Sequence, residues 1–390
     1  MHLAHLALTN VRSFRNLSID LAPGITVIAG ENGAGKTNLL EAIEMLATTR
    51  GLRGGSDLDL IAWDAIGEDL MPAARIEADV RTASGPRSLE VAVIASVAVP
   101  GVPPTRASKR FRVNGVARRA SDLIGQLRVV TFAVDDLAII DGAPANRRRY
   151  LDVTISQLDP AYLRALQRYA RVLEQRNSLL RRLQERHSRA LDQLDFWDDE
   201  LSAAGALILA RRDEAVRALA ADAALRYTEL VEGAPEPLEI GYVPGVPPEV
   251  VAAIREHDLQ ERLRAAFEAG RAEDVRRGVT RIGPHRDDLR FLIDGHPAGP
   301  SASRGQQRSA ALALRLAEVA LSTKRTGEAP VLLLDDILSE LDAGRRERIL
   351  SVAYGVDQVI ITTPDEDRPG PELLPGARRY RLLDGALIPL

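Results

Sequence analysis

The 390-residue chain contains no cysteine. This absence excludes disulfides, thiolate metal sites and a cysteine nucleophile. Long apolar runs are also missing, and the amino-terminal segment lacks the basic region and apolar stretch of a secretory signal. We therefore expect a cytoplasmic protein without a membrane partner, whose chemistry uses groups other than thiols.

Lysine is scarce, because Lys36, Lys109 and Lys324 are the only three among 51 basic residues. A genome-wide preference for arginine is the simplest interpretation. A lysine that survives in such a chain still marks a position where arginine is a poor substitute. The net charge of -4 argues against a wholly basic nucleic-acid-binding surface, but it permits a local basic face.

The order of sequence patterns predicts an α/β protein with three parts. Short strands and a glycine-rich loop precede a helix with Leu39, Leu40, Ile43 and Leu46 on one face, and residues 73–116 have the pattern of an antiparallel lobe. From Thr280 strands and helices alternate, which favours a parallel sheet buried on both faces. We predict domains at residues 1–150, 151–278 and 279–390.

The middle part carries the pattern of long helices between Asp159 and Val231. Its apolar positions step by three and four, which predicts a seam of Leu163, Leu166, Ala170, Leu173, Asn177 and Leu180. Helices of about 25 residues reach about 37 Å, so this part is short for a coiled coil. A plain helical subdomain and a projecting interaction arm both fit the pattern.

The segment GENGAGKT, residues 30–37, matches the P-loop pattern G-x-x-x-x-G-K-[ST] between a strand and a helix. Glycines let the backbone turn its N–H groups toward phosphate oxygens, and the helix amino terminus favours an anion. Lys36 would reach the terminal phosphates of ATP and Thr37 would hold Mg²⁺. The predicted ATP-binding residues are Gly30, Glu31, Asn32, Gly33, Ala34, Gly35, Lys36, Thr37 and Asn38.

The segment VLLLDDILSELD, residues 331–342, is an apolar strand that ends in two carboxylates. Such a strand is common and indicates little alone. Beside a P-loop it predicts a Mg²⁺ ligand at Asp335 and a catalytic group at Asp336 that polarises the attacking water. Lys36 is the second predicted catalytic residue.

The segment SASRGQQRSAALALRLAEVAL, residues 301–321, is a polar run that opens into an apolar helix. A helix cap explains one serine. It does not explain Gly305 with its flanking arginines and glutamines. A glycine and a hydroxyl at a helix amino terminus form an anion site, but no lysine completes a second nucleotide pocket. We expect this half-site to complete a phosphate site begun elsewhere.

Together these blocks resemble the ATPase head of the ABC class, and more narrowly the RecF family of recombinational repair ATPases. The similar blocks include LTNVRSFRNLSIDLAPGITVIAGENGAGKTNLLEAI, DGAPANRRRYLD, GPHRDDLRFLIDG, SRGQQRSAALALRLAE and LLLDDILSELD. The resemblance implies an ABC-type P-loop ATPase head with an antiparallel β lobe and an inserted helical arm. It covers both ends of the chain, whereas the helical middle matches only in type and position.

The resemblance also implies roles for two further elements. The signature, which would contact the γ-phosphate across a dimer, is Ser303, Arg304, Gly305 and Gln306, and the loop linking two active sites is Ser339, Glu340, Leu341 and Asp342. Arg304 stands where transporter ATPases often have glycine. No histidine follows Asp336, so the switch role falls to Thr362, Thr363 or another group, or is absent. The region Val129–Leu137 is the candidate for the glutamine loop.

The function that the resemblance implies is an ATP-dependent DNA-binding protein of repair and replication. ATP would close a homodimer on DNA at gaps or stalled forks, and slow, DNA-stimulated hydrolysis would release it. Partner mediator proteins would help to load the RecA recombinase. A transporter ATPase subunit, an SMC protein and a small P-loop kinase are the alternatives; the first usually has the switch histidine, and the second needs much longer helices.

Several arginines remain that could contact DNA phosphates without reading sequence. They are Arg110, Arg112, Arg118, Arg119, Arg147, Arg148 and Arg149. A solvated surface explains them as well. The segment GPHRDD, residues 283–288, either positions a site through His285 and Arg286 or forms a structured turn.

Overall fold

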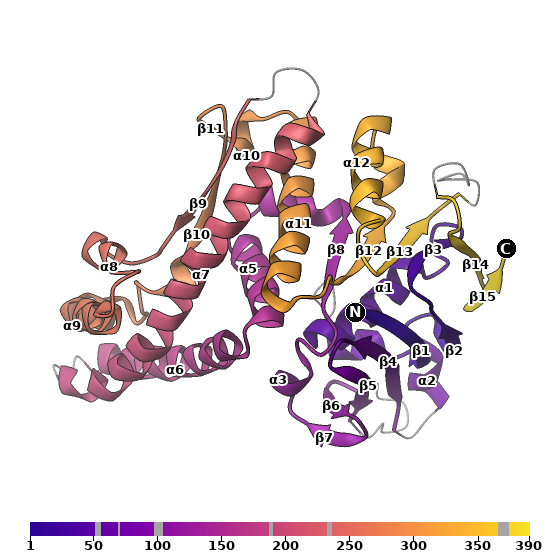
Figure 1. Ribbon diagram of the computed structural model, residues 1–390. Coiled ribbons are helices and arrows are strands. Elements are labelled where there is room, and N and C mark those ends of the chain that lie inside the picture. Colours follow the sequence, from indigo (N-terminus) through magenta and orange to yellow (C-terminus); the bar gives the residue numbers. More distant parts are fainter. Residues whose placement is uncertain (51–55, 69–70, 97–103, 187–189, 232–235, 366–373) are drawn as a thin grey trace. The chain divides into compact units, whose positions relative to one another are not determined.

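The computed structural model describes residues 1–50, 56–68, 71–96, 104–186, 190–231, 236–365 and 374–390 (Figure 1). Internal contacts divide the chain into two compact units. Unit 1 comprises Met1–Asp136, Glu229–Val231 and Arg315–Leu390, and unit 2 comprises Leu137–Thr228 and Glu232–Leu314. This division by contacts differs from the predicted domain boundaries, which stay predictions. None of the helices in the described ranges combines the length and apolar character needed to cross a membrane.

Unit 1 contains an antiparallel sheet with the strand order β2-β1-β4-β5-β6-β7. Its strands are β1 (His2–Val11), β2 (Phe14–Asp20), β4 (Ala73–Thr82), β5 (Gly85–Ala95), β6 (Ala107–Val113) and β7 (Val116–Arg118). Along β4 the alternate residues Ala74, Ile76, Ala78 and Val80 are buried. One face of the sheet therefore packs on the core, as alternation requires, and the predicted antiparallel lobe is confirmed.

The second sheet of unit 1 has the order β15-β14-β3-β13-β12-β8. Its strands are β3 (Gly24–Ala29), β8 (Val129–Ala133), β12 (Val331–Asp335), β13 (Gln358–Thr363), β14 (Arg378–Leu383) and β15 (Ala386–Pro389). All neighbours pair in parallel except β14 and β15. Every residue of β13 is buried, which confirms the predicted sheet buried on both faces. Parallel pairing brings the carboxyl ends of β3, β8, β12 and β13 to one edge, where α/β proteins bind ligands.

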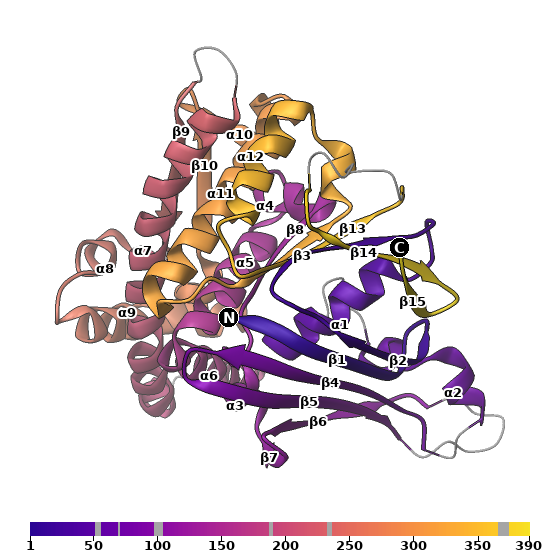
Figure 2. The same cartoon turned by 45° about the vertical axis from the view of Figure 1, so that its right-hand side comes forward.

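Helix α1 (Lys36–Thr48) packs against strands of both sheets of unit 1 (Figure 2). Its residues Leu39, Leu40, Ile43 and Leu46 are buried, as the sequence predicts, and belong to a core cluster that includes residues of both sheets. The remaining helical elements that lie wholly in unit 1 are η1 (Asp57–Leu60), α2 (Trp63–Glu68), α3 (Ala120–Leu123), η2 (Val134–Asp136), η5 (Ile337–Glu340) and α12 (Ala343–Ala353). The core thus fixes the start of α1, which is the end of the P-loop.

Unit 2 is mainly helical and includes one small sheet of order β11-β10-β9. Its strands are β9 (Leu238–Val243), β10 (Asp288–Ile293) and β11 (His296–Pro297). Its helical elements are α4 (Leu137–Ile140), α5 (Pro144–Leu158), α6 (Pro160–Glu185), η3 (Leu191–Leu194), α7 (Asp195–Leu230), α8 (Pro248–Ala252), α9 (Leu259–Arg277), η4 (Pro284–Arg286), α10 (Ala298–Ser301) and α11 (Arg304–Thr326). The chain passes into unit 1 near the end of α7 and again at Arg315 in α11.

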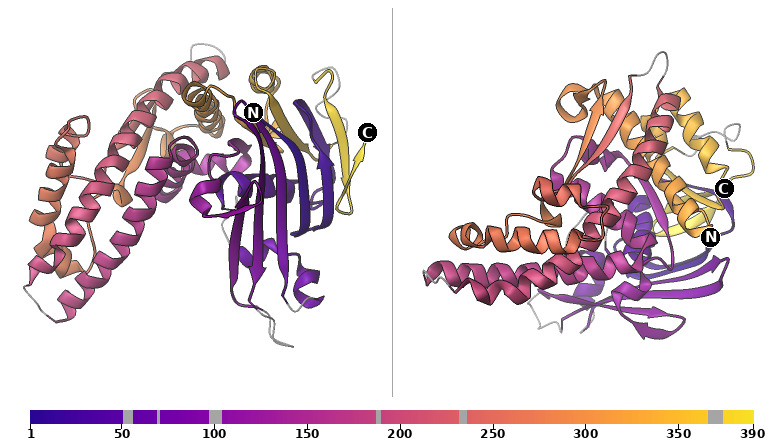
Figure 3. Two further views of the ribbon diagram at one scale, coloured as in Figure 1. Left: turned by 60° about the horizontal axis from the view of Figure 1, so that its bottom comes forward. Right: turned by 60° about the vertical axis from the view of Figure 1, so that its left-hand side comes forward.

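Helices α6 and α7 fold back on each other (Figure 3). Arg168 of α6 bonds to Glu200 of α7, and Arg176 bonds to Asp198. The predicted seam of α6 is wrong in detail. Leu163 and Leu180 are buried, as predicted, but Ala170 is exposed and Leu166, Leu173 and Asn177 are only half-buried. The buried stripe also includes Tyr162, Tyr169, Val172, Arg176, Leu179 and Leu183. The apolar pattern missed this stripe because its central residue is a charged one that buried carboxylates stabilise.

Arg176 is fully buried between α6, α7 and α9. Its guanidinium donates to Asp198 and Asp274 at 2.8 Å each and to the Thr280 hydroxyl at 2.8 Å, and it lies 5.5 Å from the centre of the Phe267 ring. A buried charge is tolerated only when it is paired and hydrogen-bonded. This ionic cluster therefore ties the three helices together.

The segment GPHRDD forms a structured turn in unit 2. Asp287 is buried and accepts bonds from Arg212 at 2.6 Å and from the Gly245 amide at 2.7 Å. His285 accepts from the Tyr169 hydroxyl at 2.9 Å and donates to the Thr280 carbonyl at 3.0 Å. Burial lowers the pKa of His285 to about 4, so the imidazole is neutral near pH 7. These contacts favour the structured turn over a site built on His285.

Replacing Arg176 by alanine should strongly destabilise unit 2. The substitution leaves Asp198 and Asp274 buried without their shared partner, a loss that costs about 3–5 kcal/mol. Urea unfolding, followed by the fluorescence of Trp197 in a Trp63→Phe background, measures the free energy of unfolding. Arg168→Ala, which breaks an exposed pair with Glu200, is the control and should cost about 0–1 kcal/mol. Equal losses in the two variants would contradict this role for the buried cluster.

Candidate nucleotide-binding site

The predicted P-loop connects β3 to α1 in unit 1, and its glycines are required by geometry. Gly33 and Gly35 have φ angles of +88° and +104°, a region that favours glycine. A Cβ on Gly30 would lie 2.9 Å from the carbonyl oxygen of Leu382. Glu31, Asn32 and Gly33 are exposed, whereas Gly35 and Lys36 are buried. The loop thus presents an open segment in front of the amino terminus of α1.

Ser13, in the turn between β1 and β2, packs against this loop. A Cβ on Gly35 would lie 2.4 Å from the Ser13 hydroxyl, and the Asn38 side-chain amide donates to the same hydroxyl at 3.1 Å. Ser13 lies within the first block that resembles the RecF family, but sequence reasoning gave it no role. Only the pairing of the first two strands brings this turn to the loop.

Lys36 is the first residue of α1, and its side chain turns back onto the P-loop. Its ammonium donates to the carbonyl oxygens of Gly30 at 2.6 Å and Glu31 at 2.9 Å. Burial lowers the pKa of Lys36, and the charges of Asp336 and Asp335 oppose this shift. The first turn of α1 contains no acidic residue. A desolvated cation at a helix amino terminus suits an anionic ligand such as a phosphate.

Thr37 and Asp335 come together at the carboxyl edge of the parallel sheet. The Thr37 hydroxyl donates to an Asp335 carboxylate oxygen at 3.1 Å, and the Thr362 hydroxyl donates to the same oxygen at 2.9 Å. Hydroxyl and carboxylate oxygens are hard ligands that fit Mg²⁺, which takes its remaining ligands from phosphates and water. The geometry therefore fits the predicted metal pair. Of the two threonines suggested for the switch role, Thr362 is the one that contacts Asp335.

Asp336 adopts a left-handed conformation, with φ of +53°. Its amide donates to the Thr362 hydroxyl at 3.1 Å, and the Ser339 hydroxyl donates to its carboxylate at 2.9 Å and to its carbonyl at 2.7 Å. These bonds fix the carboxylate beside Asp335 at the end of β12. Such a position suits a group that orients water.

The predicted loop Ser339, Glu340, Leu341 and Asp342 comprises the end of η5 and the two residues that lead into α12. Ser339, Glu340 and Asp342 are exposed and Leu341 is buried. Asp342 caps α12 by accepting from the Arg345 amide at 2.9 Å, and this bond lowers the pKa of Asp342. The cap by Asp342 and the bonds between Ser339 and Asp336 hold the loop in place, while the side chain of Glu340 stays accessible.

The predicted signature lies in unit 2, at the start of α11. Ser303 and Gln306 form a reciprocal cap, with the Gln306 amide bonded to the Ser303 hydroxyl at 3.2 Å and the Ser303 amide bonded to the Gln306 side chain at 2.8 Å. Gln306 also donates to Glu236 at 2.8 Å. The cap thus accounts for two polar residues, more than the single serine expected from sequence. Ser303 remains exposed.

Arg304, whose role the sequence left open, pairs with Asp141 at 2.7 Å. Its side chain is 73% exposed, so this pair is a surface ion pair of small energetic value. Gln307 is buried and donates to the carbonyl oxygens of Ala298 and Gly299 at 3.1 and 2.7 Å. The side chain of Arg304 can therefore change partners at little energetic cost, whereas Gln307, just after the signature, is fixed in the fold.

The candidate glutamine loop, Val129–Leu137, contains no glutamine. In it, β8 pairs with β12 so that Ala133 is opposite Asp335. Asp136 accepts from the Ala133 amide at 3.0 Å and from Arg315 at 2.6 Å. The region therefore ends at the same sheet edge as Asp335, and its role stays a prediction.

The arginines predicted to contact DNA differ in their surroundings. Arg110, Arg112, Arg118, Arg119 and Arg149 are exposed. Arg110 and Arg112 share a face of β6, whereas Arg118 pairs with Phe111 and lies on the other face. Arg147 pairs with Asp288 at 2.6 Å, and Arg148 donates to the Asp287 carbonyl at 2.8 Å. DNA contact stays a prediction for all seven arginines, and these internal bonds do not favour it for Arg147 and Arg148.

Comparison with known proteins defines the class of this fold and site. The family described as "RecF/RecN/SMC N terminal domain" matches residues 2–368. An SMC head bound to the winged-helix domain of ScpA is similar over all of this chain and 97% of that chain, with a TM-score of 0.51 and 15% identity, which shows the fold. The protein is an ABC-type ATPase head with an antiparallel β lobe and a helical arm.

Within this class the chain belongs to the RecF family. It is 48% identical over 99% of both chains to the DNA replication and repair protein RecF of Chloroflexus aurantiacus. A solved structure of the recombination mediator protein RecF-ATP in the RecFOR pathway has a TM-score of 0.86 and 30% identity, and the similarity covers 100% of this chain and 97% of that chain.

Gly35→Ala should destabilise unit 1 by about 2–4 kcal/mol, because the added Cβ combines backbone strain with a clash against Ser13. Gly24→Ala is the matched control, since Gly24 has a φ of +99° and nothing within 4 Å of its Cβ position; it should cost about 1 kcal/mol. Urea unfolding measures both. Ser13→Ala should recover much of the loss in the double variant, and failure of that recovery would contradict the clash.

Proposed function

We propose that this protein is an ATP-dependent DNA-binding protein of replication and recombinational repair. The observation that carries the proposal is the convergence of the P-loop with Asp335 and Asp336 at one sheet edge, through the bond from Thr37 to Asp335. Membership of the RecF family supports the same function. Its relatives carry the name DNA replication and repair protein RecF.

ATP would bind with its phosphates against the P-loop residues Gly30–Asn38. The ammonium of Lys36 would exchange its loop carbonyls for phosphate oxygens, because a charged acceptor forms the stronger bond. Mg²⁺ would be held by Thr37 and Asp335 and would supply charge neutralisation at the phosphates when bound. The similar solved structure is one of RecF-ATP, which supports ATP as the nucleotide.

Asp336 would orient and polarise the water that attacks the terminal phosphate, giving ADP and phosphate. Ser339 holds its carboxylate. Thr362, rather than a histidine, contacts both Asp335 and the amide of Asp336. A threonine hydroxyl cannot take a proton as an imidazole does. We therefore expect slow hydrolysis, which DNA would stimulate.

ATP would close a homodimer in which Ser303, Arg304, Gly305 and Gln306 of one subunit cover the nucleotide of the other. The exposed Ser303 at the start of α11 supports this role, since a helix amino terminus is a favourable anion site. The loop Ser339–Asp342 would link the two sites. Arg304 would leave Asp141 for the phosphate, a more highly charged partner.

The closed dimer would hold DNA at gaps or stalled forks, and hydrolysis would release it. The exposed arginines on β6 and β7 would contact phosphates without reading sequence. Recombination mediator proteins would then help to load the RecA recombinase. The similar solved protein is described as a recombination mediator in the RecFOR pathway, which supports mediator partners for this chain.

Lys36→Met should abolish ATP binding and every ATP-dependent change in mass, because the remaining side chain carries no charge for the phosphates. Lys324→Met is the matched control, since Lys324 is exposed in the last turn of α11. Sedimentation of each variant with and without ATP and gapped DNA measures binding and dimerisation together. Wild-type dimerisation by Lys36→Met would contradict the role of the P-loop.

DNA binding by the unchanged protein should weaken steeply with salt.

Ser303→Asp should preserve the helix cap but block ATP-driven dimerisation, because aspartate caps well and repels the terminal phosphate. Ser301→Asp is the control on the neighbouring helix α10.

Asp336→Asn should instead retain ATP binding, accumulate the dimer and lower turnover by at least 100-fold. Dimerisation by Ser303→Asp at the wild-type ATP concentration would contradict the shared site, and wild-type turnover by Asp336→Asn would remove Asp336 from catalysis.

A further inference from the structure

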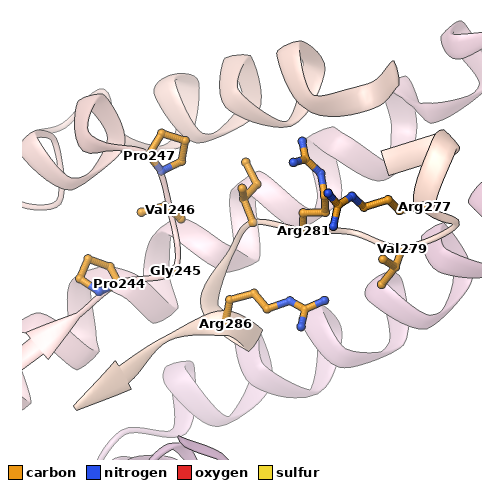
Figure 4. Close-up of a pocket in the computed structure, with 9 residues that line it drawn as sticks. Pro244, Gly245, Val246, Pro247, Arg277, Val279, Arg281 and Arg286 are labelled. Carbon is orange, nitrogen blue, oxygen red and sulfur yellow. The ribbon is translucent and has the colours of Figure 1, made fainter. Parts of the chain in front are cut away.

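Unit 2 contains a hollow of about 630 Å³ that the nucleotide site does not use (Figure 4). It is lined by Pro244, Gly245, Val246, Pro247, Arg277, Val279, Arg281, Ile282 and Arg286. Pro244–Pro247 form one side, the opposite side holds Arg277, Val279 and Arg281, and Arg286 lies along the base (Figure 4). A volume of this size falls within the range of ligand sites.

The proline-rich side of the hollow is held rigidly. The Gly245 amide donates to buried Asp287 at 2.7 Å, and the Gly283 amide donates to the Gly245 carbonyl at 2.8 Å. A Cβ on Gly245 would lie 2.4 Å from the Cβ of Arg286, so glycine allows the two segments to touch. Three prolines within Pro244–Pro248 restrict the backbone further. The hollow is therefore preformed, which lowers the entropy cost of binding.

The arginines of the hollow carry more positive charge than their neighbours balance. Arg277 pairs with Glu273 at 2.6 Å, but Glu273 also pairs with Arg276. Arg281 pairs with Asp274 at 3.1 Å, but Asp274 also serves the buried Arg176.

The third arginine, Arg286, is exposed and donates to the Thr280 carbonyl at 3.4 Å. None of the described residues that line the hollow is acidic. Its charge therefore favours an anionic ligand.

The residues that line the hollow favour a peptide over single-stranded DNA. Single-stranded nucleic acid is bound by aromatic side chains that stack on bases, and the nine lining residues include no aromatic one. Val246, Val279, Ile282 and the prolines instead offer an apolar surface to an aliphatic or proline side chain. Carboxylates flanking such a side chain would meet the guanidinium groups, which match carboxylate geometry.

We propose that this hollow binds an acidic peptide segment of a partner protein, in which Asp or Glu residues flank an aliphatic or proline residue. The carboxylates bind Arg277, Arg281 and Arg286, and the apolar residue contacts Val246 and Val279.

Selection of random 12-residue peptides displayed on phage, with the full-length protein as bait, tests this site. Peptides rich in Asp and Glu next to Leu, Ile, Val or Pro should be enriched. The most enriched peptide, labelled with fluorescein, should bind at least tenfold more weakly to the double variant Arg277→Glu and Arg286→Glu, as expected for lost charged hydrogen bonds. Fluorescence polarisation measures the binding.

Arg262→Glu with Arg264→Glu is the control, because these exposed arginines of α9 lie outside the hollow and make the same change of charge. Val246→Trp fills the hollow without changing charge and should also weaken the peptide. Enrichment of peptides without acidic residues, or equal binding by both double variants, would overturn the proposal. A loss of (dT)20 binding in the Arg277 and Arg286 variant, without acidic peptides selected, would assign the hollow to nucleic acid. The loss of ATP binding in the Lys36→Met variant is measured separately. A failure of the peptide proposal would therefore leave the proposed nucleotide site unaffected.

Discussion

The hydrogen bond from Thr37 to Asp335 joins residues that are 298 positions apart. It is possible only because β3 and β12 flank β13 in parallel, so that all three carboxyl ends reach one edge of the sheet. The buried face of α1 fixes Thr37, and the apolar β12 fixes Asp335. The predicted metal pair, the loop after Asp336 and the contacts of Thr362 with Asp335 and Asp336 all depend on this register. A slip of one residue would turn Asp335 to the other face of the sheet.

Sequence patterns predicted unit 1 well because its signals are local. The P-loop needs glycine at fixed positions, and Gly33 and Gly35 do adopt positive φ angles. Four apolar residues followed by Asp335 form a buried parallel strand, as predicted. Ser13 could not be found this way, since its place beside Gly35 depends on strand pairing. Such contacts between distant segments leave no periodic trace in a single sequence.

Unit 2 shows where pattern reasoning fails physically. The apolar spacing predicts a seam of α6 without Arg176, yet Arg176 lies at its centre and is buried with two carboxylates from α7 and α9. A charged residue in a helix normally indicates a solvent face. Its burial depends on Asp198 and Asp274, which are 22 and 98 residues away. Only the assembled helices reveal the pairing, so the three- and four-residue spacing of apolar positions places Asn177 in the seam and leaves out the neighbouring Arg176.

The bias toward arginine has a structural use in unit 2. A guanidinium satisfies several acceptors at once, and Arg212 bonds to Asp152, Asp287, the Tyr162 hydroxyl and the Pro284 carbonyl while remaining buried. These buried arginines occupy the carboxylates of the unit, so Asp274 and Asp287 have little negative charge left for the surface. The arginines around Val246 and Val279 are consequently underbalanced. The same network that holds the helices together therefore leaves a positive, apolar-lined hollow open to an acidic partner.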